Sequence, residues 1–181
     1  MTWARRLQVL RPFTKYRAQF EADTEILPPN LLGSACRRRV PHIYTEAEIH
    51  ALLEAAAQLR PVTGLCLRPR TYVTLFGLLA STGLRISEAL ALSPTDVDLP
   101  EALLTVRMTK FRKSRLVPLH PTTVTALTRY TEARRRRVSD RDIEAFLISD
   151  RGTPLIERMA QHTFAILRTR LRWIGRGDYP F

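Results

Sequence analysis

The sequence predicts a mainly α-helical fold with a small three-stranded antiparallel sheet. Apolar residues recur at three- and four-residue intervals through several segments, as they do on the buried face of a helix. Two short runs, residues 103–108 and 115–119, have strand-like composition and enclose a polar turn. The chain has 181 residues, 45% of them hydrophobic and 25% charged, as in ordinary globular domains. A chain of this length can bury a core without disulfide bonds.

The first segment, residues 1–22, is predicted to be an amphipathic helix. Trp3, Leu7 and Leu10 begin its apolar stripe, and Pro12 is expected to kink or divide it. One such helix cannot bury its stripe alone, so the stripe needs a partner. Residues 23–42 contain several prolines and a run of three arginines, which indicates an extended, basic linker.

Three helices are predicted in the middle of the chain. The first begins after Thr45, where the Thr-x-x-Glu pattern is a capping box, and continues to about Arg60. The strongly apolar residues 70–81 predict a buried helix, which Gly83 ends. A short helix over residues 86–92 follows.

The sheet and two further helices come next. Residues 109–114 form the basic turn of a predicted β-hairpin, and Pro118 indicates that the second strand is an edge strand or ends there. Residues 121–137 predict a helix with four arginines in its last turn, where cations complement the helix dipole. Residues 156–174 predict a basic amphipathic helix.

The net charge of +12 points to a polyanionic partner such as DNA, RNA or an anionic membrane. The charge is segregated: residues 1–41 hold eight bases and three acids, residues 42–100 four and six, and residues 101–181 seventeen and eight. No apolar stretch is long enough to span a bilayer, so we expect no membrane association. The two cysteines and four histidines have no metal-ligand spacing, and we expect neither a metal nor another cofactor.

One constellation of residues points to a chemistry. Arg85 opens the short helix in the segment Thr-Gly-Leu-Arg-Ile-Ser-Glu, with Glu88 one turn later. Lys110 follows in the hairpin turn, and the hairpin ends in Arg-Leu-Val-Pro-Leu, residues 115–119. In order and spacing, residues 44–174 resemble the tyrosine recombinase (phage integrase) family. Taken singly, an Arg–Glu pair one turn apart is most often a surface ion pair, and a basic turn is usually only solvated.

The resemblance implies a role for each matching residue. Arg85 would bind the scissile phosphate and stabilise its transition state, and Glu88 would orient that guanidinium. Lys110 would protonate the leaving 5′ oxygen as the general acid. Further basic residues would contact DNA phosphates: Arg112, Lys113 and Arg115 in the hairpin, and Arg37, Arg38 and Arg39 in the linker. For the linker arginines, a solvated charge run is an equally open interpretation.

The resemblance also implies a domain organisation. Residues 1–22 would be the last helical piece of a core-binding domain, residues 23–42 a basic linker, and residues 43–181 a catalytic domain lacking its C-terminal part. The family has an H-x-x-R motif and then a tyrosine nucleophile, but none of the four histidines begins that motif and Tyr179 has no such context. We therefore expect that this chain, truncated at both ends relative to the family, does not cleave DNA by itself.

Three hypotheses for function are consistent with these motifs. The first is a site-specific recombinase that binds double-stranded DNA, and the family assembles on DNA as a tetramer. The second is a non-catalytic DNA-binding accessory protein derived from an integrase. The third is an unrelated basic nucleic-acid-binding protein, although no RNP, KH, zinc-finger or zipper pattern occurs. We expect a bacterial cytoplasmic protein associated with the nucleoid.

Overall fold

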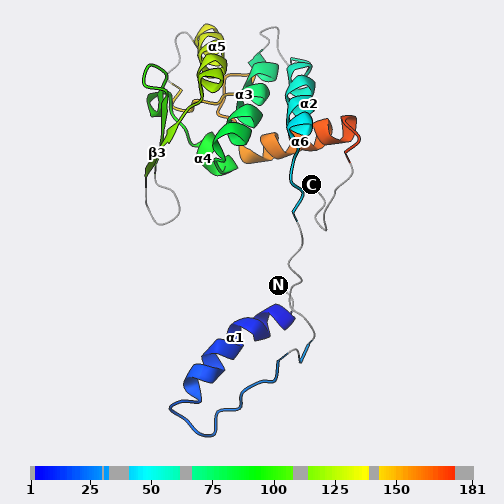
Figure 1. The fold of residues 1–181 in the computed structure, drawn as a ribbon, viewed down its shortest axis with the longest axis vertical. Coiled ribbons are helices and arrows are strands. Elements are labelled where there is room, and N and C mark those ends of the chain that lie inside the picture. The colour runs from blue at the N-terminus through cyan, green and yellow to red at the C-terminus, as the bar shows by residue number, and fades with distance from the viewer. Residues whose placement is uncertain are drawn as a thin grey trace. The chain divides into compact units, whose positions relative to one another are not determined.

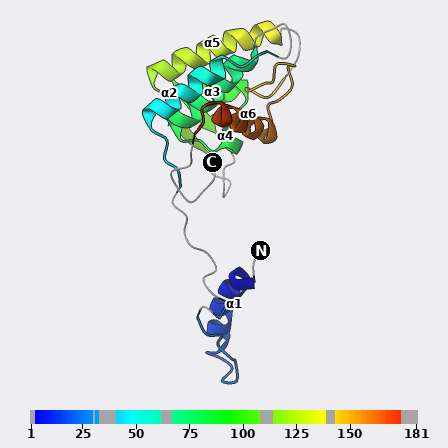
Figure 2. The same ribbon diagram turned by 90° about the vertical axis from the view of Figure 1, so that its right-hand side faces the viewer.

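The computed structural model describes residues 3–29, 31–32, 41–61, 67–107, 114–138 and 143–173. Its contacts divide the chain into two units, Met1–Ile43 with Gly175–Phe181, and Tyr44–Ile174. Figures 1 and 2 show both units from two directions.

The first unit contains helix α1, Trp3–Arg17. Pro12 lies inside α1 without dividing it, and the helix ends five residues before the predicted limit of residue 22. None of the residues of α1 is buried, and Trp3, Phe13 and Tyr16 are strongly exposed. The predicted helix is thus confirmed but is shorter and is not divided at Pro12, and among the described residues of its unit none of its side chains is fully buried.

The second unit is built around helix α3, Leu67–Thr82, which contributes seven buried residues. Helices α2, Glu46–Ala57, and α5, Pro121–Arg137, both pack against α3 (Figures 1 and 2). Helix α6, Glu157–Arg170, contacts α2 and the short helix α4, Ile86–Leu90. The predicted helices are confirmed, with ends shifted by a few residues. The core includes fully buried leucines from several of these elements: Leu75, Leu78, Leu127 and Leu167.

The predicted small antiparallel sheet is also confirmed. Its strands are β1, Val97–Asp98, β2, Leu103–Val106, and β3, Arg115–Pro118, in the order β1-β2-β3. A 3-10 turn, η1, Pro94–Asp96, leads from α4 into β1. Strand β3 is an edge strand and ends at Pro118. At the open end of the hairpin, Val106 pairs with Arg115.

A buried segment after α5 closes the core beside α3. Phe146, Leu147 and Ile148 are almost inaccessible to solvent. Asp150 follows them, and its Oδ1 accepts hydrogen bonds from the backbone N–H groups of Leu67, at 3.0 Å, and Arg68, at 3.2 Å. This carboxylate therefore satisfies the first donors of α3 from a distant part of the chain. None of the helices in the described parts of the chain is long and apolar enough to cross a membrane.

Candidate functional site

The loop between α3 and α4 presents Arg85 to solvent. Gly83 has φ +65°, a left-handed conformation that other residues rarely adopt, and it turns the chain out of α3. Leu84 then inserts into the core, and Arg85 follows as the N-cap of α4 with extended backbone. The Arg85 side chain is 65% exposed. Buried Leu84 and the turn at Gly83 thus place the Arg85 guanidinium at the start of α4.

Glu88, in α4, binds both the backbone and the side chain of Arg85. Its Oε2 accepts the backbone N–H of Arg85 at 3.0 Å, and its Oε1 accepts Nη1 of the same residue at 2.9 Å. Among the described residues, the Nε and Nη2 groups of Arg85 have no partner. The Glu88 side chain is only 8% exposed. The spacing in the sequence predicts this contact, and the structure places both residues together.

A second guanidinium reaches Glu88 from the sheet. Arg115, the first residue of β3, donates Nη2 to Oε2 at 2.7 Å and Nη1 to Oε1 at 3.2 Å. Hydrogen bonding from Arg115, the largest cause, together with the hydrogen bonds from Arg85 lowers the pKa of Glu88 to about 2, against the opposing effect of burial. Glu88 in turn raises the pKa of Arg115. Glu88 is therefore a charged carboxylate shared by two arginines.

A similar pair lies on the neighbouring strand. Arg107, directly after β2, donates Nε to Oδ1 of Asp96, whose side chain is 6% exposed. The other oxygen, Oδ2, accepts the backbone N–H of Ser93 at 2.9 Å and its hydroxyl at 2.7 Å. Burial raises the pKa of Asp96, but the hydrogen bonds from Arg107 and Ser93 outweigh burial and leave that pKa below its ordinary value. We call Glu88–Arg115 and Asp96–Arg107 the root ion pairs, because they join the base of the hairpin to the helical body.

Asp96 and Arg107 were not among the predicted site residues. The Ser-x-x-Asp spacing of residues 93–96 is a capping pattern that indicates a local role for the carboxylate. The other partner of the Asp96 carboxylate, Arg107, could be identified only from the fold. The remaining predicted residues lie outside the described part of the chain: Lys110, Arg112 and Lys113 in the hairpin, and Arg37, Arg38 and Arg39 in the linker.

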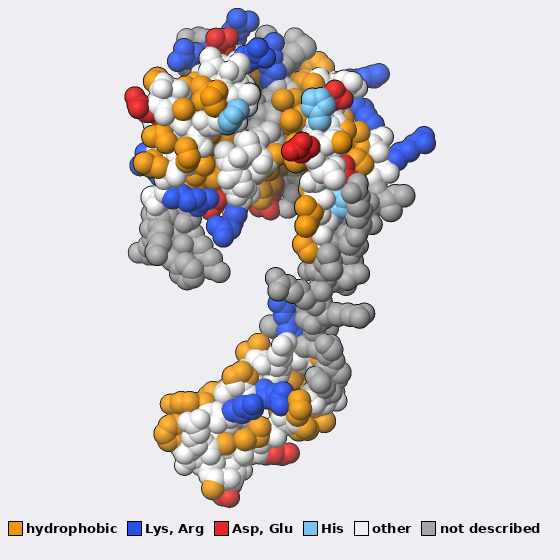
Figure 3. All heavy atoms as spheres, viewed as in Figure 1, with side chains coloured by type: hydrophobic (Ala, Val, Ile, Leu, Met, Phe, Trp, Pro, Cys, Tyr) orange, Lys and Arg blue, Asp and Glu red, His pale blue; other side chains and the backbone are white. Residues whose placement is uncertain are grey.

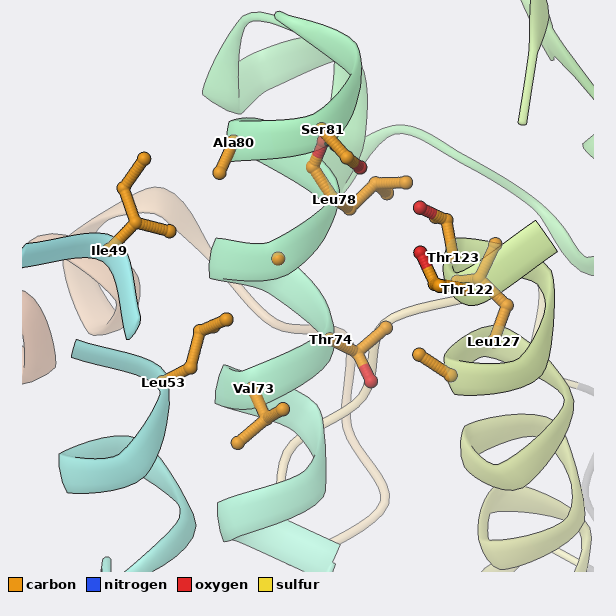
Figure 4. A pocket seen from close by; sticks show the side chains of 12 residues that line it. Ile49, Leu53, Val73, Thr74, Leu78, Ala80, Ser81, Thr122, Thr123 and Leu127 are labelled. Carbon is orange, nitrogen blue, oxygen red and sulfur yellow. Dashed lines mark hydrogen bonds between the residues drawn. The ribbon is translucent and has the colours of Figure 1, made fainter. Parts of the chain in front are cut away.

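One hollow of the second unit is poorly suited to an anion. A hollow of about 360 Å³ lies over α3, with Ile49 and Leu53 from α2 on one side and Thr123 from α5 on the other (Figure 4). None of its lining side chains is charged. On the face shown in Figure 3, basic side chains lie near the end that carries the hairpin and also at the opposite end. No cluster of metal-ligating side chains occurs within the ranges that the structure describes.

Comparison with known proteins defines the class. The profile of the Phage integrase family matches residues 42–172. The protein named "Putative integrase/recombinase y4rE" of Sinorhizobium fredii (strain NBRC 101917 / NGR234) is 44% identical over 165 residues, which cover 91% of this chain and 53% of that protein. "Tyrosine recombinase XerC" of Chlamydia caviae is 31% identical over 167 residues, covering 90% of this chain and 50% of that protein.

Solved structures agree on the fold. The XerA recombinase has a TM-score of 0.59 at 24% identity, with coverage of 91% of this chain and 52% of that chain. A lambda integrase tetramer bound to a Holliday junction has a TM-score of 0.63 at 16% identity, with coverage of 96% and 46%. The chain belongs to the phage integrase, or tyrosine recombinase, family, and it spans about half the length of the relatives it matches.

Proposed function

We propose that this chain binds double-stranded DNA through the surface formed by Arg85 and the β2–β3 hairpin, in the service of site-specific strand cleavage and rejoining. The observation that carries the proposal is the Arg85 guanidinium, which is ion-paired through Nη1 and yet 65% exposed. A planar guanidinium that is held through one nitrogen keeps further N–H groups for phosphate oxygens. Orientation before DNA arrives favours stabilisation of the charge that develops on the phosphate.

Each neighbouring residue takes a role in the proposal. Glu88 orients Arg85, because its carboxylate binds both the backbone and the guanidinium of that residue. Lys110 is the proposed general acid for the leaving 5′ oxygen, since an ammonium on a flexible stem can donate a proton there. The proposed phosphate contacts are Arg112, Lys113 and Arg115 in the hairpin and Arg37, Arg38 and Arg39 in the linker.

The proposal extends to the organisation of the chain. Residues 1–22 would belong to a core-binding domain, residues 23–42 to a basic linker, and residues 43–181 to the catalytic domain. Because no histidine in the sequence begins an H-x-x-R motif, we expect DNA binding rather than strand cleavage from these 181 residues alone. The lambda integrase structure contains a tetramer on a Holliday junction, which supports assembly on DNA as part of the proposal. The matched relatives are bacterial, and we propose an association with the bacterial nucleoid.

The binding proposal can be tested with a fluorescein-labelled duplex of about 30 base pairs. Affinity is measured over a range of salt for the wild type, Arg85→Ala and Arg70→Ala. Arg70 is a matched control, because it is an exposed arginine in the first turn of α3, at the end away from Arg85.

We expect Arg85→Ala to lower the slope of log K against log salt by about 1, the change expected for one lost phosphate contact. Arg70→Ala should leave the slope unchanged. Equal losses for the two variants would contradict a DNA site at Arg85 and would favour general attraction to a basic protein.

A further inference from the structure

The β2–β3 hairpin is attached to the helical body at both of its strands. Arg107 follows the last residue of β2, and Arg115 is the first residue of β3. Val106 pairs with Arg115 across the ladder, so the two arginines mark the point where the hairpin leaves the sheet. Each of them binds a different carboxylate, Asp96 or Glu88.

The same capping hydrogen bond fixes both carboxylates to the helical body. Each lies three residues after an N-cap and accepts the backbone N–H of that cap residue, Arg85 for Glu88 and Ser93 for Asp96. A carboxylate that caps a helix start is fixed in position by the backbone. An arginine bound to such a carboxylate is therefore fixed relative to the helix start and not merely paired on the surface.

The carboxylates of these contacts are much less exposed than those of ordinary surface pairs. The carboxylate side chains are 8% and 6% exposed, whereas the arginines are 42% exposed at Arg115 and 62% at Arg107. A carboxylate removed from water needs hydrogen-bond donors, and loss of its arginine leaves it with fewer of them. Both carboxyl groups also have pKa values below their ordinary range, so both are charged at neutral pH.

We propose that the root ion pairs are a positioning device, in which Arg107 and Arg115 hold the base of the hairpin in a fixed place relative to Arg85. Glu88 is the shared point, because it contacts Arg85 and Arg115 at the same time. The inference rests on the proposed function, since the placement serves catalysis only if Arg85 and Lys110, in the hairpin turn, act on the same phosphate. Arg115 then positions the base of the hairpin through Glu88, in addition to any contact that Arg115 makes with DNA.

Hydrogen exchange tests the positioning role without DNA. Backbone exchange is followed by mass spectrometry in the 181-residue chain for the wild type, Arg107→Gln, Arg115→Gln and the control Arg70→Gln. Glutamine can still donate one hydrogen bond, which limits the general cost of each change. The double variant Glu88→Gln/Arg115→Gln removes both charges, so it leaves no unpaired buried carboxylate.

We expect residues 103–107 and 114–118 to exchange at least about fivefold faster in both arginine variants and in the double variant, while α3 and α5 are unchanged. Arg70→Gln should have no effect on any segment. Unchanged hairpin exchange, or equal acceleration in the hairpin, α3 and α5, would overturn the proposal, because the first shows no anchoring and the second shows only general destabilisation.

Binding of the same 30-base-pair duplex separates positioning from direct phosphate contact. Arg115→Lys keeps the charge but loses the bidentate fork. We expect this variant to retain the fast hairpin exchange of Arg115→Gln. In the Arg115→Gln background, Arg85→Ala should weaken binding less than it does in the wild type, because the hairpin is then no longer held in a fixed place relative to Arg85.

Equal effects of Arg85→Ala in the two backgrounds would overturn the positioning role. If Arg85→Ala changes binding in neither background, the proposed DNA site fails, and the exchange data still decide whether the hairpin is anchored.

Discussion

Two groups of arginines in the second unit have opposite surroundings. The run Arg134–Arg137 is the densest positive charge in the sequence, but two of its members bond to backbone carbonyls. Arg134 donates Nε to Phe146 O at 3.1 Å and Nη2 to Ile143 O at 2.7 Å and Ala145 O at 2.8 Å. Arg137 donates Nε to Asp150 O at 2.9 Å.

Arg85, Arg107 and Arg115 are spread over 31 residues of sequence and bind two nearly buried carboxylates at one place in the fold. The different partners of these two groups show that charge density along the chain does not locate a functional site. The partner of each guanidinium decides its role. Carbonyls of the segment after α5 indicate structural arginines, and carboxylates at the start of a short helix indicate an oriented pair.

The largest expected effect is on stability, at Arg134. Arg134→Ala removes three hydrogen bonds and leaves partly buried carbonyls without their donor, so we expect a loss of about 2–3 kcal/mol in the free energy of unfolding. Urea denaturation measures it, with exposed Arg135→Ala as the control. A loss no larger than that of Arg135→Ala would show that Arg134 is not a structural arginine.

The next effect depends on pH and concerns Glu88. Its pKa is about 2 in the folded chain, below the value of about 4.3 expected when unfolded, so its charge stabilises the fold fully above pH 5 and progressively less as the pH falls toward 2. We expect Glu88→Gln to be about 1–2 kcal/mol less stable than the wild type at pH 7, a value reduced by the solvent exposure of both arginines. Denaturation at pH 7, 5, 4 and 3 should show the difference narrowing only below pH 5. A difference that is constant, or that grows in acid, contradicts the assignment of Glu88 as a charged partner.

The smallest expected effect is at the exposed members of the arginine run. Arg135→Ala/Arg136→Ala should change the free energy of unfolding by less than about 0.5 kcal/mol, because both side chains are exposed. Thermal and urea unfolding of the double variant measure this directly. A loss comparable with that of Arg134→Ala would remove the distinction between bonded and solvated members of the run.

Local patterns in the sequence predicted much of the fold. The capping box at Thr45 and Glu48 forms as expected, because both partners lie within one turn. The contact between Arg85 and Glu88 was also predictable, since a helix start brings residues three apart together.

Contacts across long stretches of sequence could not be predicted in this way. Glu88 meets Arg115 only after the hairpin register and the packing of α4 are set, 27 residues later in the chain. Asp150 caps α3 from 83 residues away, which explains why the start of α3 at Leu67 was not expected from residues 70–81. Asp96 and Arg107 were missed as a site pair for the same reason, because the fold brings them together.

The central claim is that DNA binding depends on the oriented arginine site and not on charge alone. The most direct test compares two double variants that each remove two positive charges, Arg85→Ala/Lys110→Ala and Arg135→Ala/Arg136→Ala, with the same 30-base-pair duplex across a range of salt. We predict that the first variant loses affinity and lowers the salt slope by about 2, whereas the second remains close to the wild type. Binding that is unaffected by the first change and abolished by the second would contradict the account and would identify a basic protein that binds nucleic acid through the run at residues 134–137.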